Sequence, residues 1–251
     1  GLCLVLGLAA PGFALLALAA ALLAAASMAV LARQPSLEMA TLAAGALAWL
    51  AGNLSLYAAL PAVPWWIAFF ALTIGGERLE LSRYLKRGAL ARGSFVVLAA
   101  ALLATPVLPR VLGLVLVMLA LWLFAYDLAR VTVRQKALPR YIAWCLLSGY
   151  AWLAFGGVLL ALATAYDTAL HAIFVGFVFS MVFGHAPVIL PAVLRVKLPY
   201  HPVLYLPLVL LHASLLVRAF VSTSAGAWGN AAAIALFILT AAVLTLFSRR
   251  A

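Results

Sequence analysis

The chain has few charged residues and almost no cysteine. Only 8% of its 251 residues are charged, whereas 69% are hydrophobic, and the mean hydropathy is +1.24. A water-soluble domain of this length needs a polar surface that this composition cannot supply, which excludes the soluble globular class. The two cysteines, Cys3 and Cys145, lie in different apolar stretches and have no paired spacing. They therefore support neither a disulfide framework nor a thiolate metal site.

Acidic residues are especially scarce, with five Asp and Glu against sixteen Lys and Arg. None of the five lies in the middle of an apolar stretch, although ion-coupled transporters usually carry acids inside their spans. The formal net charge of +11 is compatible with nucleic-acid binding. However, the cations cluster between the apolar stretches, as the positive-inside rule predicts for a membrane protein. We therefore expect a lipid bilayer as a partner and no nucleic acid.

Apolar runs of about 20 residues recur along the chain, the length that a helix needs to cross ~30 Å of hydrocarbon. The alternation of apolar and polar residues that is typical of membrane β-strands is absent. The sequence predicts an all-α protein, a polytopic transmembrane helical bundle of about nine spans. The predicted spans are 8–32, 40–60, 63–82, 93–109, 111–130, 139–164, 168–190, 201–222 and 228–248.

The basic residues also predict an orientation for these spans. If the first loop is cytoplasmic, every Lys and Arg except Arg110 and Arg218 lies inside. This arrangement puts the N-terminus out and the C-terminus in, and we expect an integral protein of the bacterial cytoplasmic (inner) membrane. The sequence does not begin with Met, so a longer natural N-terminus stays open.

Histidine is absent before Asp167, and all four histidines lie in one stretch of two apolar spans. Ionisable side chains within a bilayer are costly and usually mark a function, and neutral imidazole is a common ligand of haem iron, copper and zinc. We therefore expect residues 1–166 to form a transmembrane scaffold of about six spans. Residues 167–251 form the histidine-bearing part, of about three spans. The candidate cofactor and metal ligands are His171, His185, His201 and His212.

Helix geometry indicates how these histidines could meet. At about 100° per residue, His171 and His185 differ by roughly 40° in azimuth and ~21 Å in height, and His201 and His212 by about 20° and ~16 Å. The two spans are joined by a short turn, which predicts antiparallel neighbours. One arrangement pairs His185 with His201 and His171 with His212. The other brings His185 and His212 together in mid-membrane. Gly176 and Gly184 could leave room for a porphyrin, although small residues also serve ordinary helix packing.

The run His171-Ala-Ile-Phe-Val-Gly176, followed by Met181 and Gly184-His185, resembles the NnrS family of haem- and copper-containing membrane proteins. The resemblance implies His171 and His185 as cofactor ligands and a role in nitric oxide metabolism or tolerance. A second segment, residues 201–205, reads His-Pro-Val-Leu-Tyr. It is distantly similar to the His-Pro-Glu-Val-Tyr segment of haem–copper oxidase catalytic subunits. The acidic residue and the adjacent histidine pair of that family are missing here, so we do not expect a full oxygen-reducing centre.

The sequence therefore predicts a membrane-embedded protein that binds b-type haem, with copper as a further option. Its role would be electron transfer or the handling of a diatomic gas such as nitric oxide, with a redox partner or other membrane subunits. The alternative is a cofactor-free transporter or assembly subunit whose histidines are structural or proton-labile. In that alternative the prolines near the histidines would form a hinge around a cavity; they are Pro187, Pro191, Pro202 and Pro207. A third option is a metal-ion carrier without haem. Met181 is the only methionine on these spans, which makes a dedicated copper(I) channel less attractive.

Overall fold

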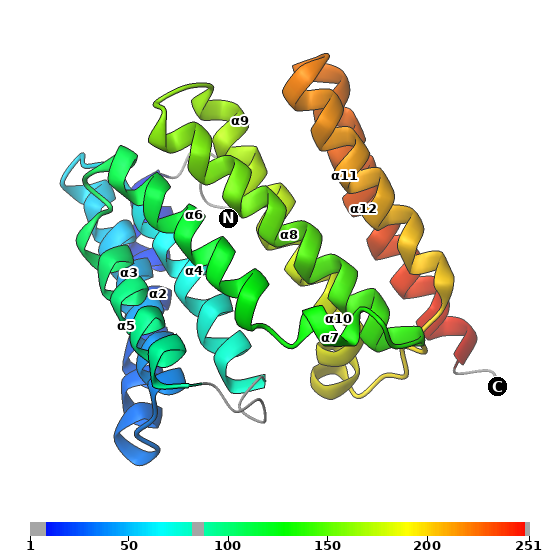
Figure 1. The fold of residues 1–251 in the computed structure, drawn as a ribbon, viewed down its shortest axis with the longest axis horizontal. Coiled ribbons are helices and arrows are strands. Elements are labelled where there is room, and N and C mark those ends of the chain that lie inside the picture. The colour runs from blue at the N-terminus through cyan, green and yellow to red at the C-terminus, as the bar shows by residue number, and fades with distance from the viewer. Residues whose placement is uncertain (1–8, 82–87, 249–251) are drawn as a thin grey trace. The chain divides into compact units, whose positions relative to one another are not determined.

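The computed structural model describes residues 9–81 and 88–248, and these residues are helical without any strand (Figure 1). The chain divides into two compact units, residues 1–119 and 120–251. The boundary falls within helix α6, Pro109–Tyr126. All four histidines lie in the second unit.

The described residues of the first unit form four helices and the first part of α6. The four are α2 (Ala9–Arg33), α3 (Leu37–Tyr57), α4 (Val63–Leu81) and α5 (Ala89–Ala104). Helix α3 begins where the Ser36 hydroxyl accepts a hydrogen bond from the backbone N–H of Met39. Helix α3 approaches α4 closely at Gly52, where an added Cβ would lie 2.8 Å from Cδ1 of Trp66. Small residues thus bring these two helices together, as is common in membrane bundles.

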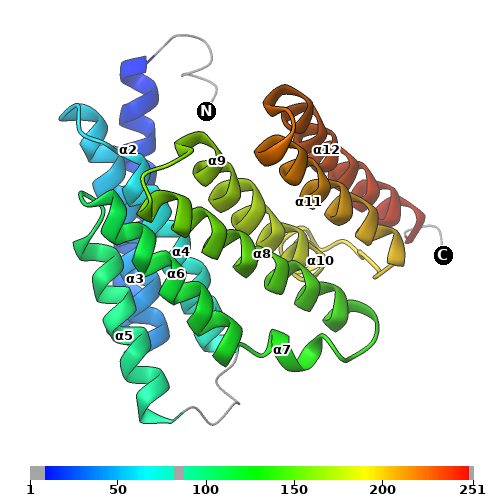
Figure 2. The same cartoon turned by 45° about the horizontal axis from the view of Figure 1, so that its top comes forward.

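The second unit contains the remaining helices. They are α7 (Ala129–Thr132), α8 (Ala137–Ala161), α9 (Tyr166–His171), the π-helix η1 (Ala172–Phe179), α10 (Ser180–Leu194), the 3₁₀-helix η2 (Pro202–Leu204), α11 (Tyr205–Phe220) and α12 (Thr223–Ser248). Residues 166–194 form one continuous span that changes from α to π and back to α. Helix α8 runs beside this span, and α11 pairs with α12 (Figure 2).

Seven helical segments in the described part of the chain are long and apolar enough to cross a membrane. The prediction of an all-helical membrane protein is therefore confirmed. Two of the nine predicted spans coincide with helices that are not among these seven. Helix α5 has only 16 residues, and α4 carries Glu77, Arg78 and Glu80 in its last turns. The count of nine spans and their orientation stay predictions.

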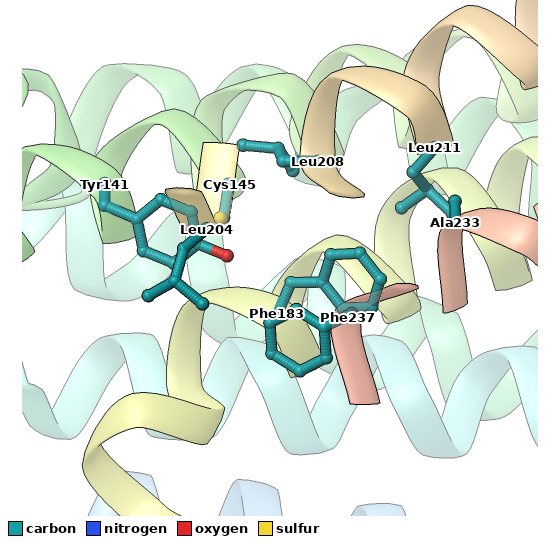
Figure 3. Close-up of a cluster of buried hydrophobic side chains, with 8 residues drawn as sticks. All are labelled: Tyr141, Cys145, Phe183, Leu204, Leu208, Leu211, Ala233 and Phe237. Atoms are coloured by element: carbon teal, nitrogen blue, oxygen red, sulfur yellow. The ribbon is translucent and has the colours of Figure 1, made fainter. Parts of the chain in front are cut away.

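A cluster of buried side chains joins five elements of the second unit (Figure 3). Its members are Tyr141, Cys145, Phe183, Leu204, Leu208, Leu211, Ala233 and Phe237. The rings of Phe183 and Phe237 stack with centroids 4.0 Å apart and planes 8° apart, which connects α10 to α12. Cys145 is a free, buried thiol within this cluster. These contacts position the helices that carry the histidines.

Two prolines, Pro187 and Pro191, lie inside α10, although proline usually kinks or ends a helix. The helix continues through both and ends at Leu194, and the C-cap residue Arg195 that follows has a left-handed φ of 52°. Each proline removes one backbone donor from the helical ladder. The interruption of regular α-helix lies earlier, in the π-helical stretch between His171 and Ser180.

Candidate functional site

The two histidine-bearing spans are antiparallel neighbours, as predicted from their short connection. Arg218 near the end of α11 bonds to Asp167 near the start of α9, at 2.8 Å. Farther along, His212 of α11 lies beside Ser180, the first residue of α10. Residue numbers thus fall along one span as they rise along the other.

His212 lies among polar groups from two other elements. The indole N–H of Trp152, in α8, donates a hydrogen bond to Nδ1 of His212 at 2.9 Å. The Nε2 atom lies 3.5 Å from Oγ of Ser180, which is fully buried. Because an indole N–H can only donate, Nδ1 carries the lone pair and the neutral ring carries its proton on Nε2. The neutral ring thus presents an N–H toward Ser180.

Gly176 determines where Trp152 can lie. A Cβ at position 176 would lie 2.6 Å from Cβ of Trp152 and 2.9 Å from its Cδ2 atom. Only glycine lets this indole lie directly against the backbone of η1, from where it reaches His212. The glycine that completes the motif at 171–176 therefore has a structural role in the contact between Trp152 and His212.

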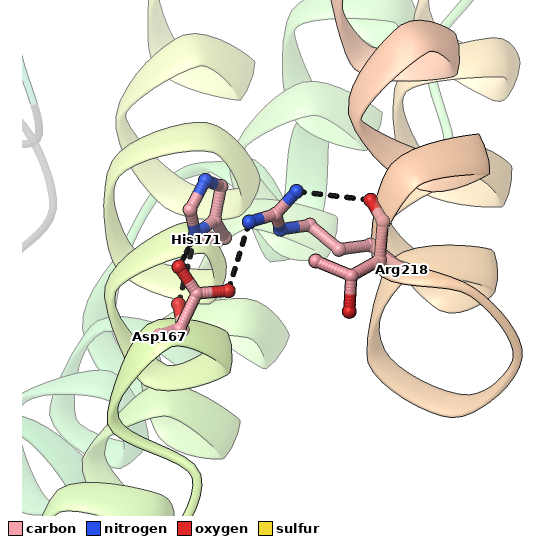
Figure 4. A network of polar contacts seen from close by, with 4 residues as sticks. Asp167, His171 and Arg218 are labelled. Atoms are coloured by element: carbon pink, nitrogen blue, oxygen red, sulfur yellow. Dashed lines mark hydrogen bonds and ion pairs between the residues drawn. The ribbon is translucent and has the colours of Figure 1, made fainter.

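His171 belongs to an ion-pair network at the end of the same span (Figure 4). Its Nδ1 atom lies 2.8 Å from the backbone oxygen of Asp167 and 3.4 Å from Oδ1 of that residue. A backbone carbonyl can only accept, so Nδ1 carries the proton and Nε2 the lone pair. Arg218 donates to the other Asp167 carboxylate oxygen at 2.8 Å and to the backbone oxygen of Thr223 at 3.1 Å. Asp167 thus neutralises one of the two cations that the positive-inside assignment left outside.

His185 and His201 also differ from each other in which ring nitrogen carries the proton. Nδ1 of His185 lies 2.7 Å from the backbone oxygen of Met181, so it donates, and Nε2 carries the lone pair. The exposed His201 caps η2, where its Nδ1 accepts from the N–H of Val203 at 3.1 Å. The hydrogen bonds therefore divide the histidines into two classes. His171 and His185 have their proton on Nδ1, whereas neutral His201 and His212 have it on Nε2.

This division predicts a measurable tautomer pattern. In protein labelled with ¹⁵N-histidine and held at a pH where the rings are neutral, NMR should show Nδ1–H for two rings and Nε2–H for the other two. Trp152→Phe should shift the His212 signals alone, because it removes that ring's donor while keeping an aromatic side chain. Four rings of one tautomer would contradict the division, and a uniform response to the substitution would contradict the Trp152 contact.

The four histidines do not converge on one site. Among the described residues, no group of three or more His, Cys, Asp or Glu side chains is placed to hold a metal ion. His212 is level with Ser180, which is five residues or ~7.5 Å before His185 along α10. The predicted 40° offset of His171 and His185 assumed an unbroken α-helix, and η1 between them has wider turns with i→i+5 bonding.

A family model matches residues 1–246, the domain of unknown function DUF8744. The chain belongs to the DUF8744 family. No curated protein and no solved structure matches it. The family description assigns no activity, and it does not bear on the resemblance to NnrS proteins.

In this DUF8744 chain the glycines near the histidines are in contact with neighbouring side chains. Besides Trp152 against Gly176, a Cβ at Gly184 would lie 2.9 Å from Cβ of Cys145, and one at Gly156 would lie 2.7 Å from Ile173. These positions serve close helix packing, so the room expected there for a porphyrin is filled. Sequence reasoning missed Trp152 and Ser180 as partners of His212. The sequence signal that could have found this contact is Trp152 itself, because an indole N–H inside a membrane span needs a hydrogen-bond acceptor.

Proposed function

We propose that the chain is an integral membrane protein that binds b-type haem through His171 and His185, with copper as a further option at one of them. Its role is electron transfer or the handling of a diatomic gas such as nitric oxide. The proposal is supported by the ring hydrogen bonds, because both Nδ1–H groups are held by carbonyls of the preceding helical turn. Ligating histidines usually donate their other ring N–H in this way, which fixes the tautomer with a lone pair on Nε2.

The same argument reduces the ligand set from four histidines to two. Ligation through Nε2 of His212 would move the ring proton to Nδ1, where it would face the N–H of Trp152 as a second donor. In His201 the Nδ1 lone pair is already used in capping η2. His171 and His185 are 14 residues apart on one span, too far apart for both to ligate one iron, so they would serve separate centres. The bound iron would supply the redox or gas-binding chemistry, and the chain would supply ligands and a low-dielectric environment.

An absorption spectrum with matched histidine variants tests this proposal. The purified protein should show reduced α and Soret bands after dithionite, with iron in the same sample. His171→Ala and His185→Ala should each lose at least half of the bound haem or copper, because each removes one ligand. His201→Ala and His212→Ala are the controls and should keep the wild-type content. A featureless spectrum without bound metal would refute the proposal.

A second candidate function, a cofactor-free transporter or assembly subunit, is favoured by two observations. Every histidine has a hydrogen bond within the chain, and the neighbouring glycines are filled by packing. The span from 166 to 194 also combines a π-helical stretch with two internal prolines. Such irregular backbone in a membrane span is tolerated where it is buried in protein or lines a cavity.

We further propose nine spans in the bacterial cytoplasmic membrane, with the N-terminus outside and the C-terminus inside. The distribution of Lys and Arg supports this orientation. Arg110 and Arg218 are the two exceptions, and Arg218 is paired with Asp167. A redox partner or other membrane subunits would bind at the cytoplasmic or outer ends of these helices.

A further inference from the structure

Six exposed cations lie at one end of the second unit, where two loops meet. These residues, named here the cationic rim, are Arg130, Arg134, Lys136, Arg140, Arg195 and Lys197. The first four lie in or beside α7 and at the start of α8, and the last two lie between α10 and η2 (Figures 1 and 2). The loops connect the ends of four membrane-length helical segments. The rim therefore lies at the ends of helices that are long enough to cross a membrane, where we expect lipid headgroups.

Aromatic side chains hold the two loops together beneath the rim. The ring of Tyr141, in the first turns of α8, lies 5.2 Å from that of Tyr205 and 6.5 Å from that of Tyr200. Leu138 packs against the same buried cluster as Tyr200 and Tyr205. Cations from two distant stretches of sequence thus share one surface on a packed base.

The local electrostatics favour an anion at this surface. The stretches 126–141 and 195–205 contain one acidic residue, Asp127, which is only 1% exposed and accepts from the N–H of Ala129. The 25-residue helix α8 begins within the rim, and its N-cap residue Lys136 makes no side-chain capping hydrogen bond. A helix N-terminus carries partial positive charge and N–H groups without helical partners.

We propose that the cationic rim binds the headgroup of an anionic phospholipid. The lipid phosphate would contact guanidinium groups from both loops, since arginine can hold a phosphate with two hydrogen bonds. The acyl chains would follow the exposed apolar surface next to the rim, which includes Trp144, Leu206 and Val209 at 49%, 61% and 62% exposure. Clusters of cations beside membrane spans bind anionic lipids, with about a fivefold gain in affinity for each cation. This binding is independent of whether haem is present.

Native mass spectrometry of the purified protein with added phosphatidylglycerol or phosphatidylcholine tests the proposal. The rim variant Arg134→Gln/Arg140→Gln/Arg195→Gln should lose at least tenfold in affinity for phosphatidylglycerol. Its binding of phosphatidylcholine should stay at the wild-type level, which also shows that the variant is folded. The lysine version of the same triple variant should keep most of the affinity.

The matched control removes three exposed cations from the first unit, as Arg33→Gln/Arg92→Gln/Arg110→Gln. It should bind phosphatidylglycerol like the wild type. An equal loss in rim and control variants would overturn the proposal, because it would show general attraction to a positively charged protein. Wild-type binding by the rim variant would also overturn it. Displacement of the lipid by millimolar inorganic phosphate would overturn the assignment of the site to a lipid.

Discussion

Gly226→Ala should destabilise the second unit by about 3 kcal/mol or more, because there is no room for a methyl group between α11 and α12. The new Cβ would lie 2.5 Å from the backbone nitrogen of Arg218 and closer still to its Cα and Cβ atoms. Since part of the obstacle is backbone, no side-chain movement can relieve it, and the two helices must separate. The free energy of unfolding, followed by circular dichroism in mixed micelles titrated with SDS, measures the effect.

The separation would also weaken the contacts on either side of Gly226. Gly229 packs against Ser214, whose hydroxyl donates to Asn230 at 2.5 Å, and Arg218 holds Asp167. Gly93→Ala in α5 is the control, because nothing lies within 4 Å of its added Cβ. That change should leave stability equal or up to about 1 kcal/mol higher, since alanine is the better helix former. Wild-type stability of Gly226→Ala would show that α11 and α12 are not this close.

Gly176→Ala should cost about 2–3 kcal/mol in the wild-type protein and almost nothing when Trp152 is replaced by glycine. Here the obstacle is the side chain of Trp152, whose Cβ would be 2.6 Å from the new methyl group. Trp152→Gly removes that side chain and is itself destabilising, so the informative quantity is the effect of Gly176→Ala in each background. A double-mutant cycle on unfolding free energies should give a coupling of at least about 2 kcal/mol.

Gly149→Ala serves as the control for this cycle, because its nearest obstacle is the flexible end of Met181, at 2.8 Å, and the nearest backbone atom, the oxygen of Phe177, is 3.3 Å away. It should cost less than about 1 kcal/mol, since a methionine side chain can move aside. In the Gly176→Ala protein the ¹⁵N NMR signals of His212 should also shift, as they do in Trp152→Phe, because the indole no longer reaches that ring. Equal costs of Gly176→Ala in the two backgrounds would contradict the close contact of Trp152 with η1.

The arrangement of the four histidines shows what reasoning along the sequence could and could not specify about the site. Four histidines on two spans indicated a shared centre, and the antiparallel arrangement of those spans is confirmed by the contacts of Arg218 and His212. Their convergence depended on an unbroken helical period between His171 and His185, which η1 interrupts. Which ring nitrogen carries the proton depended on Trp152, a residue 60 positions away from His212.

The sequence by itself determined the class of the protein and the places of its helices. Apolar runs of membrane length, separated by proline, glycine and cations, predict helices to within about five residues, because these signals are local and act through hydrophobicity and backbone geometry. Only the tertiary structure decided which side chains meet. It placed Trp152 against Gly176 and His212, joined Asp167 to Arg218, and gathered cations from two loops on one surface. Such contacts depend on the rotation and closeness of neighbouring helices, which small residues set by packing and which no periodicity within one helix specifies.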